Sequence, residues 1–331
     1  MLLWQSCKPT AAPVYQQPKM RGVNLVAPPK RIDSEAFVPI RQVNAEWVAV
    51  IPYGFCRPDQ PHFRFEHHGQ WWGETKTGVI ETILLARKNG HKIMLKPHVW
   101  VGGGSYTGDF DLKTESQWQI FEKDFSRYII TYAKMADSLD VELFCIATEM
   151  DNFIRKRTPF WKALIKQVRT IYKGPLTYAD NWNHYDKNPL WGDLDLIGVD
   201  AYFPLSAENQ PSITDLQKGW RPHLRDLEKF AAQWQKPILF TEFGYRSTDF
   251  STHKPWESYQ QLPENQQLQA DAYRAFFKEV WPQKWLAGAF VWKWFLQKNI
   301  GEGYRGDNFT PQGKMAQSVL ADSFRRAKDS K

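Results

Sequence analysis

The feature that most constrains the fold is a repeated alternation of short, strand-like apolar segments with longer helical segments. The eight strand-like segments cover residues 20–24, 47–51, 92–98, 142–149, 176–181, 194–202, 237–244 and 287–292. Helical patterns cover residues 34–43, 75–89, 114–138, 159–172, 213–234, 264–280 and 311–327. Such alternation predicts a parallel α/β sheet, and a count of eight strands allows the sheet to close into a (β/α)8 TIM barrel. We therefore expect a single barrel domain over residues 20–328.

The first 19 residues predict a flexible leader, because prolines interrupt them and no periodic pattern runs through them. The residues up to Cys7 resemble the end of a bacterial lipoprotein signal, which makes a lipid anchor at Cys7 possible. The apolar run is short and lacks a basic region before it. The resemblance to a lipoprotein signal still favours an extracytoplasmic lipoprotein or a secreted protein. The alternative is a disordered cytoplasmic tail.

Charge and composition argue against several classes of protein. The net charge of +7 comes from 43 basic and 36 acidic residues that are spread along the chain, so no nucleic-acid footprint is expected. The sequence contains no run of about 18 apolar residues, which is the length that would predict a membrane span. The three cysteines, Cys7, Cys56 and Cys145, are too few for a disulfide framework.

Polar residues stand at or near the ends of the predicted strands, where TIM-barrel active sites lie. They are Asn24, His98, Glu149, Asn181, Asp200 and Glu242. A long segment over residues 52–72, which we expect to be a loop, adds several aromatic residues. Loops of that length are usually functional or disordered, and the aromatic content favours a functional loop that stacks on sugar rings.

Two glutamates close apolar strands of the same design, Glu149 at the end of the fourth strand and Glu242 at the end of the seventh. In a ring of eight strands these ends lie three places apart, so the two carboxyl groups can face each other. A separation of about 5 Å would suit a retaining glycosidase, and about 6.5–9.5 Å an inverting one. The structural alternative is that the carboxylates only pair with Lys96 or Arg246.

Several strand ends, in the right order, resemble glycoside hydrolase family 113, which contains retaining β-mannanases of clan A. The matching segments are residues 94–98, 144–149, 176–182, 197–204, 240–247 and 291–294, and the resemblance runs from about residue 20 to residue 325. It implies a hydrolase that cleaves β-1,4-mannosidic bonds in mannan or manno-oligosaccharides by double displacement. A β-mannan or manno-oligosaccharide would then be the binding partner.

The resemblance also implies roles for individual residues. Glu149 would be the acid/base and Glu242 the nucleophile, with Tyr202 donating a hydrogen bond to the nucleophile. Most of the clan has Asn before the acid/base, where this chain has Thr148, so Asn181 becomes the candidate for contacting the sugar 2-hydroxyl. The other residues assigned to substrate binding are Asn24, Lys96, His98, Trp182, Asp200, Tyr245 and Trp292.

Three other functions remain open at this point. The chain could be a carbohydrate-binding barrel that has lost catalysis, or a glycosidase that acts on another β-linked glycan. A metal-dependent barrel hydrolase could use His98, Asp180, His184 and Asp200, although these residues lack the spacing of common metal motifs. We expect neither a metal nor a cofactor.

Overall fold

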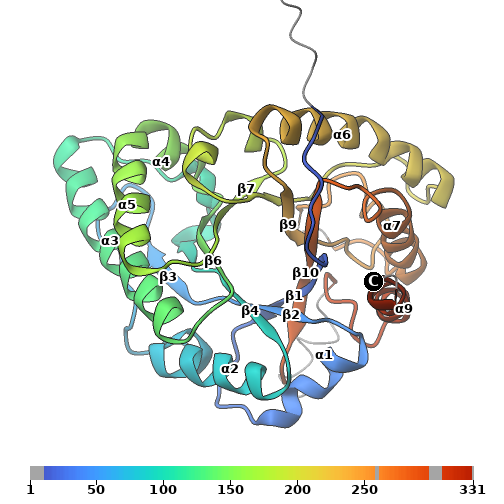
Figure 1. The fold of residues 1–331 in the computed structure, drawn as a ribbon, viewed down its shortest axis with the longest axis horizontal. Helices are drawn as coiled ribbons and strands as arrows, with labels where there is room; N and C mark the ends of the chain where they lie inside the picture. The colour runs from blue at the N-terminus through green and yellow to red at the C-terminus, as the bar shows by residue number, and fades with distance from the viewer. Residues whose placement is uncertain (1–10, 258–260, 298–307, 330–331) are drawn as a thin grey trace, which may run out of the picture.

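The computed structural model describes residues 11–257, 261–297 and 308–329. Eight parallel strands close into a barrel whose order around the ring is β1-β10-β9-β8-β7-β6-β4-β2. These strands are β1 (Met20–Val26), β2 (Trp47–Val50), β4 (Lys92–Leu95), β6 (Leu143–Thr148), β7 (Leu176–Asn181), β8 (Ile197–Asp200), β9 (Ile238–Phe243) and β10 (Leu286–Phe295). The predicted (β/α)8 barrel is therefore confirmed (Figure 1).

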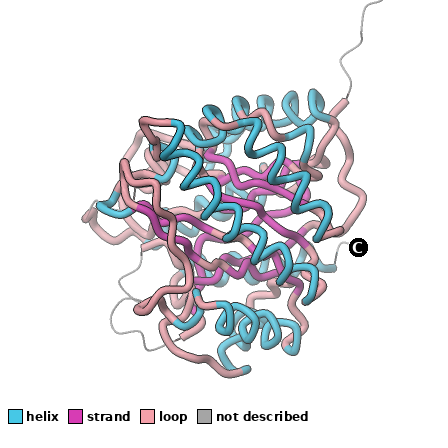
Figure 2. Tube along the Cα trace, turned by 90° about the vertical axis from the view of Figure 1, so that its left-hand side faces the viewer, coloured by secondary structure: helices cyan, strands magenta, loops and turns pink. Residues whose placement is uncertain are grey.

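Helices surround the barrel and cover its outer surface, as the side view also shows (Figure 2). They are α1 (Val38–Gln42), α2 (Lys76–Lys88), α3 (Glu115–Ser138), α4 (Asp151–Lys156), α5 (Thr158–Ile171), α6 (Ile213–Trp234), α7 (Gln266–Glu279) and α9 (Met315–Asp329). Local signals fix their starts; at α3, for example, Thr114 and Gln117 form a reciprocal capping box. The short helix α4, directly after β6, was missed by the sequence analysis.

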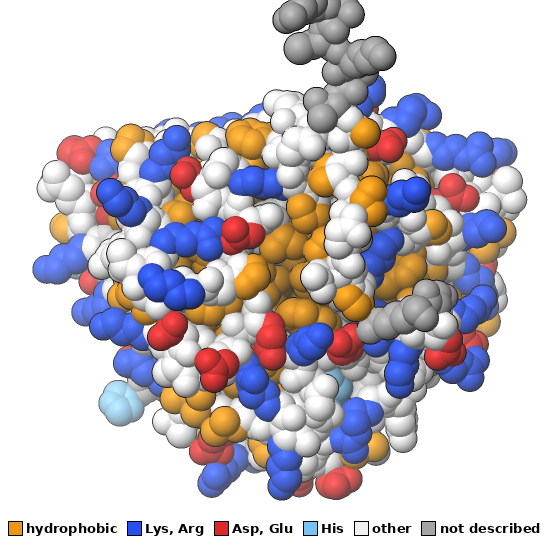
Figure 3. All heavy atoms as spheres, in the orientation of Figure 1, with side chains coloured by type: hydrophobic (Ala, Val, Ile, Leu, Met, Phe, Trp, Pro, Cys, Tyr) orange, Lys and Arg blue, Asp and Glu red, His pale blue; other side chains and the backbone are white. Residues whose placement is uncertain are grey.

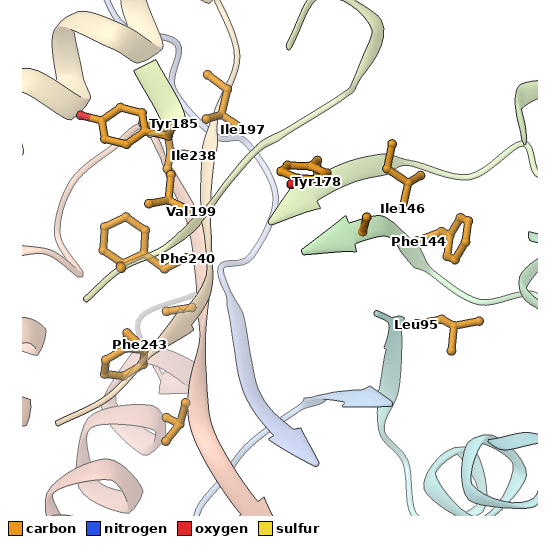
Figure 4. Close-up of a cluster of buried hydrophobic side chains, with 14 of the residues drawn as sticks. Leu95, Phe144, Ile146, Tyr178, Tyr185, Ile197, Val199, Ile238, Phe240 and Phe243 are labelled. Atoms are coloured by element: carbon orange, nitrogen blue, oxygen red, sulfur yellow. The ribbon is translucent and has the colours of Figure 1, made fainter. Parts of the chain in front are cut away.

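Alternating side chains of the strands build two apolar layers. Inward-facing residues such as Trp47, Met94 and Phe290 fill the barrel interior. Outward-facing residues pack against the helices, and Figure 4 shows several of them, including Phe144, Ile146 and Phe240. The layers leave the strand ends as the place where polar side chains can gather.

Two parts of the predicted strand pattern were wrong. The third strand was expected to run over residues 92–98, but β4 ends at Leu95 and a separate strand, β5 (His98–Val101), follows Pro97. Proline cannot donate a backbone hydrogen bond to a sheet, which accounts for the interruption. The long segment over 52–72 is also not all loop, because it contains β3 (Tyr53–Cys56), which pairs in parallel with β5.

The described part of the predicted leader, residues 11–19, crosses the end of the barrel where the strands begin (Figure 1). The Tyr15 backbone NH donates to Lys284 O at 2.9 Å, and the Lys19 ammonium group donates to Gln283 O at 2.7 Å. Tyr15 also packs against the interior cluster. Figure 3 shows apolar side chains gathered in the middle of this face.

The possible lipid-anchor residue Cys7 lies outside the described residues. The other two cysteines, Cys56 and Cys145, are buried and free. Within the described ranges, every helix is too short or too polar to cross a bilayer.

Gly198 in β8 is required by close packing between strands. A Cβ atom at this position would overlap the carbonyl oxygen of Tyr178 and lie 2.7 Å from Thr177 Oγ1. We expect Gly198→Ala to lower the free energy of unfolding by about 1–3 kcal/mol, because backbone atoms of β7 cannot move aside cheaply. Urea denaturation measures the change. Gly192→Ala is the control: its Cβ would lie 3.7 Å from Trp234, an ordinary contact, and should leave stability nearly unchanged.

Candidate active site

The carboxyl ends of β4, β8 and β9 bring one lysine and two carboxylates together. Lys96 Nζ lies 2.5 Å from Glu242 Oε1 and 3.5 Å from Asp200 Oδ1, and all three side chains are buried. The strand register places Asp200 opposite Glu242 and also opposite Asn181. Three neighbouring strands therefore present polar side chains at one level of the barrel rim.

Glu242 is held at both of its oxygen atoms. Lys96 binds Oε1, and the Tyr202 hydroxyl donates to Oε2 at 2.6 Å. His98 Nε2 lies 3.7 Å from Oε1. These contacts fix the direction of the buried carboxylate and place a cation against it, which offsets the cost of its burial.

Glu149 follows β6 directly and adopts a φ of 48°, in the left-handed region that non-glycine residues rarely occupy. Two backbone NH groups anchor this turn: Glu149 N donates to the backbone oxygen of Ala179 at 2.8 Å, and Met150 N donates to the Tyr178 side-chain hydroxyl at 2.5 Å. Strained conformations of this kind persist where the surroundings over-determine them and often occur at functional sites.

The electrostatic environments of the two glutamates differ. Burial raises the pKa of the Glu149 carboxyl well above its usual range, and the charges of Asp200, Glu242 and Asp151 raise it further. Lys96 opposes this effect. The site therefore holds one carboxyl whose pKa is raised and one carboxylate that is paired with a lysine.

Burial also affects the pKa values of Lys96 and Asp200. Burial alone would lower the pKa of Lys96, but the carboxylates of Asp200 and Glu242 outweigh it and raise that pKa. Burial and the charge of Glu242 raise the pKa of Asp200 to about 7, against the opposing effect of Lys96 and of a 2.8 Å hydrogen bond from Thr241 Oγ1. Lys96 therefore stays charged at the centre of the site.

An aromatic wall borders this group. The rings of His98 and Trp292 are parallel, with centroids 6.0 Å apart, and Lys96 Nζ lies 5.9 Å from the Trp292 ring. Burial and the neighbouring Lys96 lower the pKa of His98 well below its usual range, so the imidazole is neutral. His98 Nε2 is buried without a hydrogen-bond partner.

A second polar group adjoins Glu149. The Tyr106 hydroxyl donates to Asp151 Oδ2 at 3.0 Å and accepts from Asn181 Nδ2 at 2.7 Å. His184 Nδ1 pairs with the same Asp151 oxygen. Sequence reasoning missed Tyr106 and Asp151; the only local signal was the position of Asp151 two residues after Glu149.

The remaining predicted residues lie in different surroundings. Trp182 stacks on Trp256 with ring centroids 5.0 Å apart. The Asn24 amide is buried and donates to Thr241 O at 3.0 Å, which ties β1 to β9. Tyr245 is fully buried and near Tyr273 of α7. The substrate-binding roles of these residues stay predictions.

The residues considered for a metal site divide into two groups. His98 and Asp200 lie beside Lys96 and Glu242, whereas Asp180 and His184 line a separate hollow with Asp151. Across residues 11–257, 261–297 and 308–329, no set of three His, Cys, Asp or Glu side chains is arranged to hold a metal ion. The geometry of these residues gives the metal-dependent alternative no support.

A closed parallel barrel with two unlike carboxyl groups at its carboxyl-terminal rim is the arrangement of a glycoside hydrolase. The chain belongs to Glycoside Hydrolase Family 113, whose family model matches residues 34–314. The resemblance seen in the sequence is thereby confirmed, and the chain is a glycoside hydrolase.

Solved structures agree with this fold. The GH113 beta-mannanase AaManA from Alicyclobacillus acidocaldarius, in complex with ManMIm, has a TM-score of 0.82 and 23% identity, covering 94% of this chain and 99% of that one. A GH113 beta-1,4-mannanase complex has a TM-score of 0.80 and 24% identity, covering 93% and 99%. A beta-glucuronidase from Faecalibacterium prausnitzii has a TM-score of 0.62 and 14% identity, covering 95% and 49%. No match was found among curated protein sequences.

The raised pKa of Asp200 makes stability depend on pH. An unfolded Asp titrates near pH 4, so between about pH 4 and pH 7 the folded state retains a proton that the unfolded state loses. The free energy of unfolding should therefore fall as pH rises through this window and level off above it. In Asp200→Asn this contribution is absent, so the difference between wild type and variant should shrink or reverse toward pH 7.

Urea denaturation at intervals from pH 4 to pH 8 measures that difference. Asp226→Asn, which removes an exposed carboxylate on α6, is the matched control for the change in charge. Parallel stability profiles of wild type and Asp200→Asn would contradict the assignment.

Proposed function

We propose that the protein hydrolyses β-1,4-mannosidic bonds in mannan or manno-oligosaccharides by a retaining, double-displacement mechanism. The single observation that carries this proposal is the unequal state of the two glutamates: Glu149 is a buried carboxyl with a raised pKa, and Glu242 is paired with Lys96. A retaining glycosidase needs one proton donor and one ionised nucleophile on either side of the scissile bond.

In the first step, Glu149 donates its proton to the glycosidic oxygen while a Glu242 oxygen attacks the anomeric carbon. The bond from that carbon to the leaving oxygen breaks, and the leaving sugar departs with a hydroxyl group. In the second step, Glu149 accepts a proton from water, the water oxygen bonds to the anomeric carbon, and the ester to Glu242 breaks. Glu149 then holds its proton again.

Buried polar atoms without partners at the rim support the binding of a sugar. They are His98 Nε2, Thr148 Oγ1 and Asn181 Oδ1. A buried polar atom that lacks a hydrogen bond is costly, and sugar hydroxyl groups could supply the missing bonds. Trp292, half-buried beside His98, offers an apolar surface for the face of the same sugar. Mannan as the preferred glycan is suggested by the mannanases among the structural neighbours.

Substrate choice and stereochemistry are tested together. We expect the protein to release reducing ends from β-mannan and glucomannan, with much lower rates on cellulose and xylan. Proton NMR during the first minutes should detect a product with the β configuration of the substrate. A first product with the α configuration would contradict the retaining mechanism, and faster hydrolysis of xylan or cellulose would contradict the choice of mannan.

The roles of the two glutamates are separated by chemical rescue. Glu149→Ala should lower kcat by about 10²–10⁴-fold, because general acid catalysis is lost. Azide should partly restore its activity on an aryl glycoside with a good leaving group, since departure then needs no proton and azide attacks the glycosyl-enzyme. Glu242→Gln should be inactive with or without azide.

Steady-state rates and the identification of a glycosyl azide measure the rescue. Glu208→Gln, which alters an exposed carboxylate, should match wild type. Substantial activity in Glu242→Gln, or rescue of that variant instead of Glu149→Ala, would reverse or remove the assignment.

A further inference from the structure

We propose that one face of the β3–β5 pair is an extended binding platform for the glycan, on the glycone side of the cleaved bond. The proposal rests on the proposed function, because the occupant is the continuation of its substrate. Tyr53, Phe55, His98 and Trp100 make up this platform, which we call the aromatic face.

The pleat of the two strands creates the aromatic face. Tyr53 pairs with His98 and Phe55 pairs with Trp100 in the parallel register. Residues two apart on a strand point to the same side, so all four rings share one side of the pair. The ring centroid of Tyr53 lies 5.3 Å from that of His98 and 6.5 Å from those of Phe55 and Trp100.

The opposite side of the same pair is core. Cys56, Val99 and Val101 are all buried there. A Cβ atom at Gly54 would overlap the ring of Phe63, so the pair sits tightly on the layer beneath it. The four aromatic rings therefore lie on the side of the strand pair that faces away from the core, and packing on the other side holds the pair in place.

Exposure increases along the aromatic face with distance from the barrel. His98 is only 7% exposed, Tyr53 and Phe55 are half-buried, and Trp100 is 54% exposed. A large exposed tryptophan leaves apolar surface in contact with water, and such a surface is typical of a binding site that a ligand covers. A polymer that enters the site along this face would cover it.

The aromatic face is continuous with the candidate active site. His98 stacks parallel to Trp292 and lies 3.7 Å from Glu242. A glycan chain that places one sugar at Glu242 and Trp292 can therefore place its next sugars along the rings of Tyr53 and Trp100. Flat rings suit the faces of β-linked hexoses, because most of the hydroxyl groups are equatorial and leave C–H bonds on the ring face.

Polar groups stand beside the outer end of the aromatic face. A hollow of about 330 Å³ is lined by Phe55 and Trp100 together with Arg57, Gln60, His62 and Arg64. Backbone hydrogen bonds in both directions between Phe55 and Arg64, at 2.7 and 2.8 Å, hold the polar segment against β3. Side-chain donors beside an aromatic ring are what a neutral polyhydroxylated ligand requires.

The glycone side follows from the positions of the two glutamates. The leaving group must lie beside the proton donor Glu149, whose charge acts on Tyr106, and the Tyr106 hydroxyl in turn accepts a hydrogen bond from Asn181. The aromatic face instead joins the site at Glu242, which attacks the sugar that remains bound. Its occupants are therefore the sugars of the glycosyl-enzyme, not those of the leaving chain.

The test compares long and short substrates. Linear oligosaccharides of three and six sugars are taken from whichever β-glycan the wild type hydrolyses fastest, and the ratio of their kcat/KM values is measured. In Trp100→Ala we expect the advantage of the six-sugar substrate to fall about tenfold, through KM, because one stacking surface is lost. Trp100→Phe should retain part of the advantage.

Leu84→Ala removes an apolar side chain on α2 that is 50% exposed and should leave the ratio at its wild-type value. A ratio that is equal in wild type and Trp100→Ala would overturn the platform. A Trp100→Ala product profile shifted only toward shorter leaving fragments, with an unchanged glycone side, would also overturn it.

A binding measurement separates this proposal from the proposed function. Calorimetry compares the single variant Glu242→Gln with the double variant that carries both Glu242→Gln and Trp100→Ala. Each protein is titrated with mannan and cellulose fragments of three and six sugars. If the wild type hydrolyses no β-glycan, the proposed function has failed. The platform still stands if Glu242→Gln binds the six-sugar ligand more tightly and the Trp100→Ala change removes that preference, and it falls if binding shows no dependence on length.

Discussion

The site depends on one buried cation. Lys96 pairs with both Asp200 and Glu242, and all three side chains are buried. Burial is costly for each charge alone, but a tight ion pair with added hydrogen bonds offsets much of that cost. The Tyr202 and Thr241 hydroxyl groups add those bonds, one to each carboxylate. The backbone NH of Lys96, bonded to Val50 O at 2.9 Å, fixes the cation to the rim.

The same cation makes the two glutamates unlike. Glu242 makes direct contact with Lys96, whereas the strongest electrostatic influences on Glu149 after burial are the negative charges of Asp200 and Glu242. Ionising Glu149 would add a further negative charge to a site with one lysine at its centre. Burial and these neighbouring negative charges together raise the pKa of Glu149 and keep its proton in place.

The sequence predicted features that are contained within one segment and missed contacts between residues that are far apart in the chain. The eight barrel strands and both rim glutamates follow from short apolar runs that end in polar residues, a signal contained within each segment. The pairing of β3 with β5 joins segments more than 40 residues apart, and only Pro97 hinted that β4 stops before His98. Tyr106 reaches Asp151 and Asn181 through the fold alone. For the same reason the sequence could not show that the Asn24 amide bonds to backbone oxygens.

The interruption at Pro97 explains how a barrel can carry a platform outside its ring. Backbone bonds from Lys96 N to Val50 O and from His98 N to Pro52 O, both 2.9 Å, continue the pairing of β2 and β4 across the proline. The β3–β5 pair therefore leaves the rim with its register and pleat set by the barrel. His98 is the first residue of that pair and also the ring that stacks on Trp292. Because one residue belongs to both parts, the direction of the aromatic face relative to Glu242 is fixed by strand pairing, and a loop in its place could not provide that.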